Sequence, residues 1–396
     1  MKITTSAIEF GTSKIVTLIG EGNGNNPADL LGSGIVPYDG YLDGEWNQPD
    51  DVVNECIRRS VELAQSAAQK KIDEIYVGVP GEFIKVEVNE VTLPLSEGGR
   101  RVTVDDVDRI MLDAMNYQPA SGKVIHRNPA WFSVDDKRTM EPVGIKGQAL
   151  RCMATFVVAD EAFIKDIQSR MGALDLQVKD FASSSLGEAL MLIPPDERDK
   201  QAVLVDVGYI STEVMVAEGD ALIYHGVVPA GGGHIAADLA YGLECSMLTA
   251  EQVKRKFALG TPPPATIDAN DADGNHVSFE GSFVRAIVEP RVDEIAQLVQ
   301  ENLSSVGLML STRNNYYLTG GGLAMMRGGR EYLSAQMERM VKAPLPLAAK
   351  LNSPMYSSSL GLLELVYESI AQEDESAQGG GVFKKAGSFF KDFFTK

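Results

Sequence analysis

The sequence is poor in cysteine, in histidine and in long apolar runs. Its 396 residues include three widely spaced cysteines, Cys56, Cys152 and Cys245, so neither a disulfide framework nor a cysteine zinc site is expected. None of the four histidines stands at metal-ligand spacing from a cysteine or another histidine. No run approaches the roughly 18 apolar residues of a membrane-spanning helix, and the N-terminus has no secretion signal. We therefore expect a cytoplasmic chain without a metal site built from side chains alone.

Basic residues are also scarce. Lysine and arginine number 36 against 55 aspartates and glutamates, which gives a formal net charge of −19. Because binding to nucleic acid needs clustered Lys and Arg, nucleic acid is not expected as a partner. Apolar residues make up 44% of the chain, as in a well-packed globular protein, and the length suffices for two to four domains.

Two stretches half a chain apart follow one pattern. "SAIEFGTSKIVTLIGEG" (6–22) contains an apolar strand, an acid–apolar–Gly turn with small hydroxyl residues, and a second strand. "AVLVDVGYISTEVMVAEG" (202–219) repeats that pattern, with residues 206–208 standing where residues 9–11 stood. A third apolar segment follows each stretch. The repetition predicts a duplicated three-strand meander, although two unrelated hairpins can also look alike.

Hydrophobic periodicity predicts the remaining elements. An insertion at 81–160 has the pattern of a β-α-β-β unit, whose helix begins at a Thr-x-x-Asp cap. The polar stretch 261–275 is expected to be a loop. The predicted elements outside the meanders are helices at 51–69, 103–115 and 161–173, strands at 72–80, 83–93, 124–134, 148–158 and 314–322, two or three helices up to about residue 310, and further helices up to about residue 370.

Glycine-bearing turns indicate a ligand cleft. Residues 11–14 and 206–208 occupy the equivalent hairpin turns, where backbone N–H groups can point at phosphates. A third glycine element, "LTGGGLAMM" (318–326), ends a strand, and its glycines let the backbone approach a flat ligand closely. Each signal alone fits an ordinary turn, but three in this order are much more specific. We expect a nucleotide cleft between two halves.

These three elements resemble the phosphate-1, phosphate-2 and adenosine motifs of the actin/Hsp70/hexokinase superfamily. Within it the chain resembles the FtsA family of bacterial cell-division proteins along nearly its whole length, through "AIEFGTSKI", "PVGIKGQALR", "VVPAGGGHIAADLAYGL", "TAEQVKRKF", "EPRVDEI" and "YYLTGGG". The resemblance implies an α/β, actin-like duplicated two-lobed fold with an FtsA-type 1C (β-α-β-β) insertion and a C-terminal amphipathic helix. The implied parts are subdomain 1A (1–80 and 161–195), 1C (81–160), 2A (196–225 and 301–370), 2B (226–300), a disordered linker (371–381) and the helix (382–396).

The resemblance also implies that ATP or ADP is bound with Mg²⁺. Glu9 and Asp206 would hold the magnesium ion, Asp206 through a bound water. Glu251 and Lys254, one helical turn apart, also fit an ordinary solvated ion pair. The residues that would contact the nucleotide are Gly11, Thr12, Ser13, Lys14, Asp206, Gly208 and Tyr209 at the two turns, Gly231 and Gly232 near the phosphates, Glu251 and Lys254 at the ribose or adenine, and Gly320, Gly321 and Gly322 around the adenosine.

Four residues depart from the family pattern. Glu9 and Glu213 stand where aspartate is usual, and Tyr209 and Ile210 replace glycines. Because β-branched Ile resists positive φ, either the second turn keeps ordinary dihedrals and touches phosphate less, or the nucleotide is displaced. The extra methylene of Glu9 disturbs the placement of a hydrated magnesium ion, and a misplacement of about 1 Å can cost about a hundredfold in rate. We expect hydrolysis to be slow or absent.

The end of the chain is apolar and basic. Residues 382–396 contain five of the fourteen phenylalanines, and four lysines against one aspartate. On a helix these residues separate into an apolar and a charged face, which is typical of a helix lying in a membrane interface. The alternative is a helix folded back onto the protein's own core. The residues expected to bind the membrane are Val382, Phe383, Lys384, Lys385, Phe389, Phe390, Lys391, Phe393 and Phe394.

Taken together, the resemblance implies an ATP-binding protein that polymerises at the membrane and anchors FtsZ to the cytoplasmic face of the cell membrane at the division site. The partly acidic FtsZ C-terminal peptide would dock on 2B, where Lys254, Arg255, Arg285 and Arg291 are the candidate contacts. Other implied partners are further copies of the chain, anionic lipids and, through 1C, other division proteins. A small-molecule kinase or a pilus-assembly adaptor on the same fold is the alternative, but neither would need the C-terminal amphipathic segment.

Overall fold

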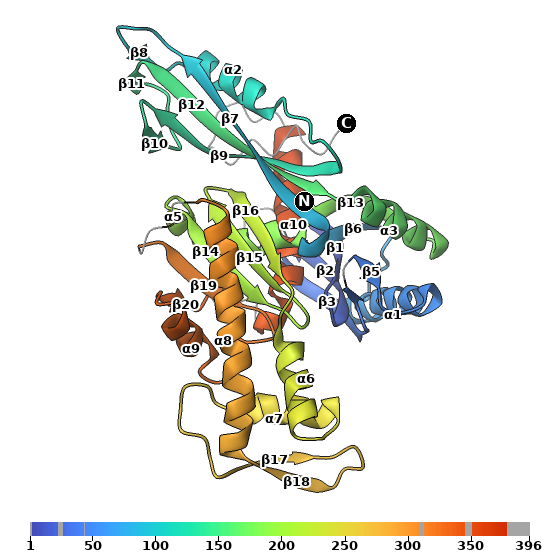
Figure 1. The fold of residues 1–396 in the computed structure, drawn as a ribbon. Helices are drawn as coiled ribbons and strands as arrows, with labels where there is room; N and C mark the ends of the chain where they lie inside the picture. Colours follow the sequence, from blue (N-terminus) through green and yellow to red (C-terminus); the bar gives the residue numbers. More distant parts are fainter. Residues whose placement is uncertain are drawn as a thin grey trace.

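Two five-stranded sheets organise the molecule, one in each lobe (Figure 1). The computed structural model describes residues 2–22, 27–42, 44–308, 310, 313–344 and 351–377. The first sheet has the order β13-β6-β1-β2-β3 and the second β16-β15-β14-β19-β20. Their strands are β1 (Ile3–Phe10), β2 (Lys14–Gly22), β3 (Asp29–Pro37), β6 (Glu74–Val79), β13 (Gln177–Ser183), β14 (Ala202–Val207), β15 (Thr212–Glu218), β16 (Ala221–Val228), β19 (Asn315–Thr319) and β20 (Val341–Lys342).

Both sheets contain the same meander, which confirms the predicted duplication. Antiparallel pairs join β1 to β2 and β2 to β3, and likewise β14 to β15 and β15 to β16. Glu9 lies opposite Val16 in the first hairpin, and Asp206 lies opposite Glu213 in the second. The two acids therefore stand at the same distance from their turns. In each sheet the first strand also pairs in parallel with a later one, β1 with β6 and β14 with β19.

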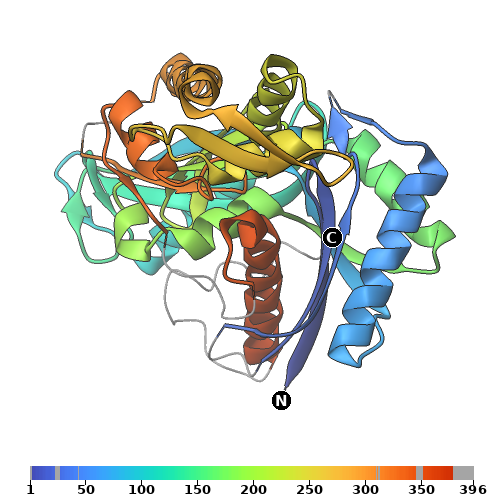
Figure 2. The ribbon, with the colours of Figure 1, turned by 90° about the horizontal axis from the view of Figure 1, so that it is seen from below.

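Helices cover both faces of the first sheet (Figure 2). On one face α1 (Asp50–Ala68) packs on β2 and β3, and on the other α10 (Ser357–Ala377) packs on β1 and β2. α10 also lies along α4 (Ser184–Leu192), which contacts β15 and β16 of the second sheet. Leu363 of α10, Leu186 of α4 and Leu204 of β14 belong to one apolar cluster. The pair α4–α10 therefore fills the space between the lobes.

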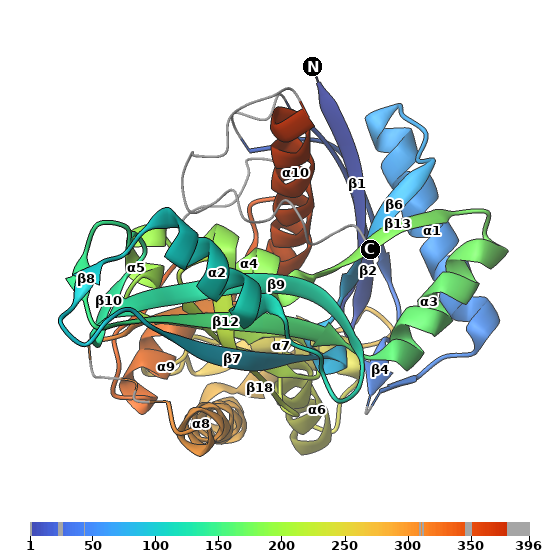
Figure 3. The same ribbon diagram turned by 90° about the horizontal axis from the view of Figure 1, so that it is seen from above.

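A separate four-stranded sheet, β10-β9-β12-β7, forms the predicted insertion (Figure 3). α2 packs on β7 and β12, and Ile110, Phe132 and Phe156 centre the apolar cluster that they share. The short pair β8–β11 extends this subdomain. Its elements are the 3₁₀ turn η1 (Gly81–Phe83), β7 (Ile84–Pro94), β8 (Arg100–Arg101), α2 (Val104–Met115), β9 (Lys123–Val134), β10 (Lys137–Thr139), β11 (Lys146–Gly147) and β12 (Ala149–Ala159).

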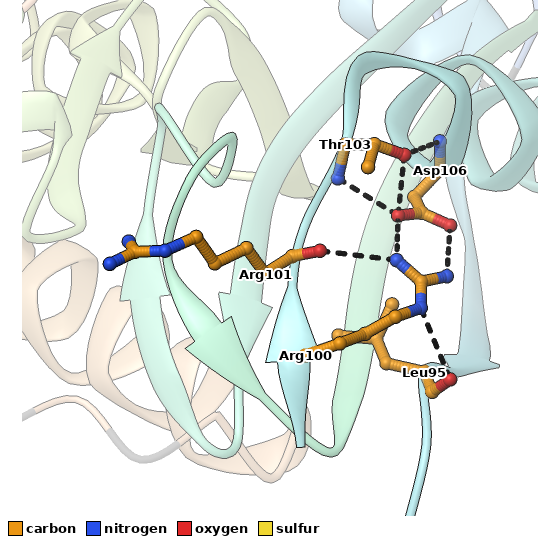
Figure 4. Close-up of polar contacts among 5 residues, drawn as sticks. All are labelled: Leu95, Arg100, Arg101, Thr103 and Asp106. Carbon is orange, nitrogen blue, oxygen red and sulfur yellow. Dashed lines mark hydrogen bonds and ion pairs between the residues drawn. The ribbon is translucent and has the colours of Figure 1, made fainter.

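The cap predicted for α2 is present, as part of a hydrogen-bond network among Arg100, Thr103 and Asp106 (Figure 4). Asp106 N–H donates to Thr103 Oγ1 over 3.2 Å, and Thr103 N–H donates to Asp106 Oδ2 over 2.8 Å, so both halves of a capping box are present. Arg100 adds two bonds to the same carboxylate, at 2.5 and 2.6 Å. Arg101 points its side chain away from this network.

The insertion also rests on the second lobe. Asn128 Nδ2 donates to the Asp220 carbonyl over 3.0 Å at the turn between β15 and β16. Nearby, Arg138 pairs with Glu218 while its guanidinium lies 4.6 Å from the centre of the Trp131 ring. Trp131 belongs to the apolar cluster of the second lobe. A subdomain inserted in the first lobe thus holds a hairpin of the second.

Subdomain 2B lies at the far end of the second lobe, where α8 extends beyond the sheet (Figure 1). Contrary to our prediction, 261–275 is not wholly a loop, because residues 266–270 pair with residues 276–280 in a hairpin. Ile267 and Ala269 are buried in this hairpin, so tertiary packing stabilises a strand of low apolar content. The elements here are α6 (Gly232–Gly242), α7 (Met247–Lys256), β17 (Thr266–Asn270), β18 (His276–Glu280) and α8 (Gly281–Ser305).

Two boundaries at the end of the chain differ from prediction. α10 packs most extensively on α4 and then on β1 and β2 of the first sheet, so residues 357–370 lie against elements assigned to subdomain 1A and not with subdomain 2A as expected. The helix also continues to Ala377, into the predicted disordered linker 371–381, through a run rich in Ala, Gln and Glu, which favour helix. The expected amphipathic helix, 382–396, lies outside the described residues. The remaining short elements are β4 (Tyr41–Leu42), β5 (Glu45–Trp46), α3 (Glu161–Ala173), α5 (Pro195–Arg198), α9 (Gly329–Gln336) and the 3₁₀ turn η2 (Pro354–Tyr356).

Within the described residues, none of the helices combines the length and the apolar character needed to cross a lipid bilayer.

Candidate functional site

Two equivalent turns face each other between the lobes. In the first, Gly11 N–H donates to the Lys14 carbonyl over 3.0 Å, and in the second Gly208 N–H donates to the Ser211 carbonyl over the same distance. The turns also touch, because Ile210 N–H donates to Thr12 Oγ1 over 3.4 Å. The duplicated sequence pattern therefore places its two glycine turns against each other between the lobes, where the sequence predicts the nucleotide cleft.

The first turn retains the groups that bind phosphate. Neither Thr12 N–H nor Ser13 N–H donates a hydrogen bond to another described residue. Among those residues, Lys14 has no carboxylate partner within 4 Å, and its ammonium lies 5.8 Å from the centre of the Tyr356 ring. Two unpaired N–H groups beside an ammonium form an anion site of the kind that holds phosphate.

The second turn offers less. Tyr209 and Ile210 both keep negative φ, so the turn has ordinary dihedrals, the first of the two alternatives considered from the sequence. Tyr209 N–H has no partner among the described residues, whereas Ile210 N–H is taken up by Thr12 Oγ1. The carbonyl groups of this turn accept hydrogen bonds from both later glycine elements: Gly232 N–H donates to Gly208 at 2.9 Å, Gly233 N–H to Tyr209 at 2.6 Å, and Gly322 N–H to Val207 at 2.7 Å.

Gly231 and Gly232, which the resemblance places near the phosphates, use their N–H groups within the protein. Gly232 N–H holds the second turn, and Gly231 N–H donates to Nδ1 of His234 over 3.2 Å. A Cβ on Gly232 would lie 2.4 Å from the Gly322 Cα, so the two glycine elements are in direct contact. These glycines shape the cleft by close backbone packing and donate no free N–H to it.

Gly320 is the one glycine of the third element with a positive φ, although close backbone contacts also exclude a side chain at Gly322. Its φ is +89°, and an added Cβ would lie 2.0 Å from Asp206 Oδ1 and 2.4 Å from the Val207 carbonyl oxygen. Gly321 packs on Met355 instead, where a Cβ would be 3.1 Å away. Gly320 thus seats the end of β19 directly against the acid of the second turn.

Four carboxyl groups surround the floor of the cleft. Burial raises the pKa of Glu9 to about 7, with Lys14 opposing and Glu213 adding to the shift. Burial, followed by the charge of Glu213, likewise raises the pKa of Asp206 to about 7. The pKa of Glu188, on α4, is raised well above its usual range, again by burial and then by Asp206. Near neutral pH several of these groups are therefore at least partly protonated.

Two oxygens of this cluster accept no hydrogen bond from an N–H or hydroxyl group of the described residues, although the carboxyl groups of Asp206 and Glu188 hydrogen-bond each other. They are Asp206 Oδ1 and Glu188 Oε1, and both atoms are buried. Buried polar atoms are nearly always paired, by protein or by ordered water. Nowhere in the described part of the chain do three or more Asp, Glu, His or Cys side chains form a group that could hold a metal ion directly. A proton shared between the two carboxyl groups, or an ordered water, satisfies these oxygens.

Glu213 joins the two lobes. Its Oε2 accepts hydrogen bonds from Ser185 of α4 at 2.6 Å and pairs with His225 Nε2 of β16 at 3.0 Å. A Cβ on Gly81, at the entry to the insertion, would lie 2.3 Å from its carboxyl carbon. Although burial raises the pKa of Glu213, the bonds from His225 and Ser185 hold it below its usual value. This acid is consequently charged and structural.

Glu251 and Lys254 lie at the outer wall of the cleft, and they are not a solvated pair. Lys254 is 5% exposed, and its Nζ donates to the Gly232 carbonyl at 2.8 Å and to Glu251 Oε1 at 2.6 Å. Burial lowers the pKa of Lys254, opposed by the charge of Glu251. The predicted role of Lys254 in binding a partner on the surface of 2B is wrong, because its ammonium is buried and bonded to Gly232 and Glu251.

The three arginines predicted on 2B differ in availability. Arg255 exposes 77% of its side chain. Arg285 is half exposed and pairs with Glu289 at 2.7 Å. Arg291 is mostly buried and bonds Asp238 at 2.6 Å. Arg255 is thus the most accessible of these cations, and it lies on α7, apart from the phosphate turns.

Sequence reasoning missed two features. Glu188 is the single acid in the apolar run "SSLGEALML", and a lone acid inside a buried helix was the signal that could have found it. Large apolar side chains are exposed on 2B: Tyr241 (90%), Leu248 (67%) and Phe283 (48%). No charge or glycine pattern marks them, and they emerge only once burial is known.

Models of two protein families match the chain. A model described as "Cell division protein FtsA" matches residues 203–361, and one described as "SHS2 domain inserted in FTSA" matches residues 81–158. Together they cover more than half of the chain, and the second coincides with the four-stranded insertion.

Curated relatives are similar over almost the whole length. The cell division protein FtsA of Buchnera aphidicola subsp. Schizaphis graminum is 23% identical, with 98% of this chain and 97% of that protein covered. The FtsA of Escherichia coli (strain K12) is 24% identical, with 91% and 90% covered.

Solved structures share the fold. A PilM-PilN type IV pilus biogenesis complex has a TM-score of 0.61 and 16% identity, with 92% of this chain and 98% of that chain covered. MreB5 of Spiroplasma citri bound to ADP has a TM-score of 0.54 and 13% identity, with 95% and 99% covered. At these identities the likeness establishes the actin-like architecture.

Proposed function

Because the chain belongs to the FtsA family of actin-like cell-division proteins, we propose that it binds ATP or ADP in the cleft and polymerises at the membrane. In this proposal it anchors FtsZ to the cytoplasmic face of the cell membrane at the division site. The observation that carries the proposal is the pair of equivalent turns facing each other between the lobes, one of them with unpaired N–H groups beside Lys14. Fold alone would not assign a ligand, whereas this local chemistry favours a phosphate.

The residues present fit the phosphates of a nucleotide. Thr12 N–H, Ser13 N–H and the Lys14 ammonium would hold the terminal phosphates, and Tyr209 N–H would meet them from the other turn. Gly320 and Gly322 lie against the second turn and would bound the adenosine side, with Glu251 toward the ribose. Titration of full-length protein with MgADP by calorimetry tests this. Loss of binding in Lys14→Ala but not in Lys71→Ala, an exposed lysine outside the cleft, is expected.

The residues also fit a hydrated magnesium ion. Asp206 Oδ1 receives no N–H or hydroxyl donor from the described residues and is an acceptor that a metal-bound water would satisfy, and Glu9 lies at the equivalent position of the first turn. When bound, the ion would neutralise phosphate charge. Raised pKa values for both acids mean that one or both must lose a proton as the ion binds, so binding should strengthen from pH 6 to pH 8.

Hydrolysis is proposed to be slow or absent. The Ile210 N–H of the second turn is taken up by Thr12 Oγ1, and a tyrosine and an isoleucine stand where glycines would let the backbone approach the phosphate. A turnover near one per second, measured on protein truncated after Gln378, would contradict this.

Membrane attachment is proposed for residues 382–396, which lie outside the described structure. The phenylalanine and lysine content of that segment supports it, since each lysine near an anionic leaflet adds roughly 1 kcal/mol and the apolar face buries in the interface. Full-length protein should co-sediment with vesicles containing phosphatidylglycerol, and protein ending at Gln378 should not. Phe390→Ser and Phe393→Ser together should abolish binding, whereas Ser388→Ala should leave it unchanged. Equal sedimentation of the two chain lengths would remove the anchor.

Docking of the FtsZ C-terminal peptide is proposed on 2B. The exposed Tyr241, Leu248 and Phe283 offer apolar contacts, and Arg255 offers an accessible cation for a partly acidic peptide. Fluorescence anisotropy of a labelled peptide should show weaker binding to Arg255→Glu. The matched control is Arg58→Glu, a charge reversal on α1 of the other lobe. Equal losses in both would indicate non-specific electrostatics.

Polymerisation is proposed from family membership and the actin-like fold. Electron microscopy of full-length protein with ATP on an anionic lipid monolayer tests it. Filaments support the proposal, and their absence would leave an anchor that does not polymerise.

A further inference from the structure

Tyr209 places a large ring between the second turn and the Glu251–Lys254 pair. Its backbone carbonyl accepts the bond from Gly233 N–H at 2.6 Å, which fixes the residue against the first turn of α6. The ring lies on that turn, because a Cβ on Gly233 would be 3.0 Å from Tyr209 Cε1 and 3.1 Å from Cδ1. Only glycine at position 233 leaves room for this arrangement.

The other side of the ring meets the residues expected to hold the ribose. Lys254 Nζ lies 5.9 Å from the ring centre, within the range of a cation–π contact. Burial raises the pKa of the Tyr209 hydroxyl, and the charges of Glu251 and Asp39 raise it further, so both acids face the ring. The phenol is therefore neutral, half-buried and enclosed by α6 and the Glu251–Lys254 pair.

Glu251 and Lys254, the pair that encloses the ring, already have hydrogen-bond partners within the protein. Lys254 donates to the Gly232 carbonyl at 2.8 Å and to Glu251 at 2.6 Å, and both contacts anchor α7 to the start of α6. With the ring in this place, a ribose cannot reach Glu251 from the phosphate turns without displacing an aromatic side chain. Tyr209 thus fills the space between the phosphate and ribose ends of the cleft.

We propose that Tyr209 is a built-in competitor of the nucleotide, whose ring packs on α6 beside the Glu251–Lys254 pair and must swing out before ADP or ATP can span the distance from the phosphate turns to that pair. The proposal rests on the nucleotide binding proposed above. It makes Tyr209 a residue that sets affinity, and it accounts for an aromatic side chain at a position where the sequence pattern leads one to expect glycine. The ring stabilises the cleft without ligand and weakens the binding of ligand.

Calorimetric titration of full-length protein with MgADP, together with thermal melts without ligand, tests this proposal. Because Tyr209 has negative φ, alanine fits the same backbone, so Tyr209→Ala removes the ring and leaves the turn. We expect Tyr209→Ala to bind MgADP about tenfold more tightly than the wild type and to melt a few degrees lower in its absence. Tyr209→Phe keeps the ring and should bind like the wild type. Tyr332→Ala, on α9 outside the cleft, is the matched control for loss of a half-buried tyrosine and should not tighten binding.

The outcomes separate this proposal from the proposed function. Equal affinity in wild type and Tyr209→Ala overturns the competitor and leaves nucleotide binding standing. Binding by Tyr209→Ala alone supports the competitor and shows that the wild-type cleft is closed to nucleotide. Absence of binding in every variant overturns both. Tighter binding in Tyr209→Phe to the same extent as in Tyr209→Ala would assign the effect to the hydroxyl and overturn the role of the ring.

Discussion

At the scale of single residues, the floor of the cleft concentrates acid around one lysine. Glu9, Glu188, Asp206 and Glu213 come from four different elements of both lobes, and Lys14 is the cation that opposes their charge. Bringing like charges together in a buried site raises pKa values, and such clusters are common at functional sites. The pKa of Glu213 is lowered instead, by its bonds to His225 and Ser185.

The raised pKa of Glu9 predicts a measurable pH dependence of stability. A carboxyl whose folded pKa is about 7 holds a proton that the unfolded chain loses near its ordinary value of 4.5. Its contribution to stability is therefore complete below about pH 4.5 and is lost as the pH rises through 7. Glu9→Gln should reduce the fall in melting temperature between pH 5 and pH 8.

The control for Glu9 is an acid shifted in the other direction. Glu21 has a pKa lowered to about 2 by its bonds to Lys2 and Lys70, so it does not titrate between pH 5 and 8. Glu21→Gln should leave the pH dependence in that window unchanged. Identical pH profiles for wild type and Glu9→Gln would show that Glu9 is ionised throughout.

Gly320 offers a second test at this scale. Gly320→Ala forces a methyl group within 2.0 Å of Asp206 Oδ1 at a φ of +89°. Gly144 has nearly the same φ, +86°, with no atom within 4 Å of an added Cβ. Gly144→Ala should cost about 1 kcal/mol of unfolding free energy from backbone strain alone. Gly320→Ala should cost more in urea unfolding and should also weaken MgADP binding. Equal losses of unfolding free energy in the two variants would mean that the backbone of the third glycine element shifts to accommodate the methyl group.

Much of the site could be predicted residue by residue, because glycine turns and duplicated acids are local patterns. Glu9, Lys14 and Asp206 follow from the repeat itself. The burial of Lys254 could not be predicted, since an i,i+3 Glu–Lys pair has the same sequence signature on a solvated face and in a cleft. Glu188 was also missed, because nothing local says which acid in a chain with 55 acidic residues is buried.

At the scale of elements, one side chain, Asp106, both caps the N-terminus of α2 and binds the neighbouring strand β8. Asp106 closes the capping box with Thr103 and binds Arg100 of β8 through both oxygens (Figure 4). The bonds from Arg100, despite burial, lower the pKa of Asp106 well below its usual range. Its contribution to stability is thus present above the ordinary aspartate pKa and is lost as the pH falls below it.

Asp106→Ala should destabilise the insertion by about 2 kcal/mol, the sum of a lost cap and a partly exposed bidentate pair. Asp105→Ala removes the neighbouring exposed acid in the same turn and should cost less than about 0.5 kcal/mol. Urea unfolding at pH 7 measures both, and hydrogen exchange should show faster exchange of α2 amides in Asp106→Ala. If the two variants unfold alike, the network in Figure 4 adds nothing beyond the helix dipole.

Elements with strong local signals were predicted well, and those that depend on tertiary contacts were not. α3 begins at Glu161 and ends at Ala173 as its periodicity predicts. The β17–β18 hairpin was missed because its strands are polar and gain stability from α7, where Thr249 Oγ1 donates to the Asn270 carbonyl over 3.0 Å. The placement of α10 on the first sheet was missed too, since periodicity says that a face is buried and not what covers it.

At the scale of the whole molecule, the insertion acts as a second connection between the lobes. It is part of the first lobe by sequence, yet Asn128 and Trp131 contact the β15–β16 hairpin of the second. Arg198 ties that hairpin to the end of α4, with bonds to the Gly219 carbonyl at 2.9 Å and to Asp220 at 2.6 Å. A change in the angle between the lobes must therefore be accompanied by movement at this junction.

The ion pair between Arg138 and Glu218 tests how firmly the insertion holds the second lobe. Glu218 is 2% exposed, and burial raises its pKa even with Arg138 and Gln201 as partners. Arg138→Met leaves this acid buried without its cation and should cost about 1–2 kcal/mol, less than a fully buried pair because Arg138 is half exposed.

The loss of unfolding free energy in Arg138→Met should depend on pH. Without Arg138 the pKa of Glu218 rises further, so the deficit in urea unfolding should be larger at pH 8, where the acid must ionise, than at pH 5. Adding Glu218→Gln to Arg138→Met should recover most of the loss, because it removes the buried charge. A deficit that is independent of pH and not recovered in the double variant would assign the effect to the stacking of Arg138 on Trp131, and the two lobes would then be joined there by packing without an ionic contribution.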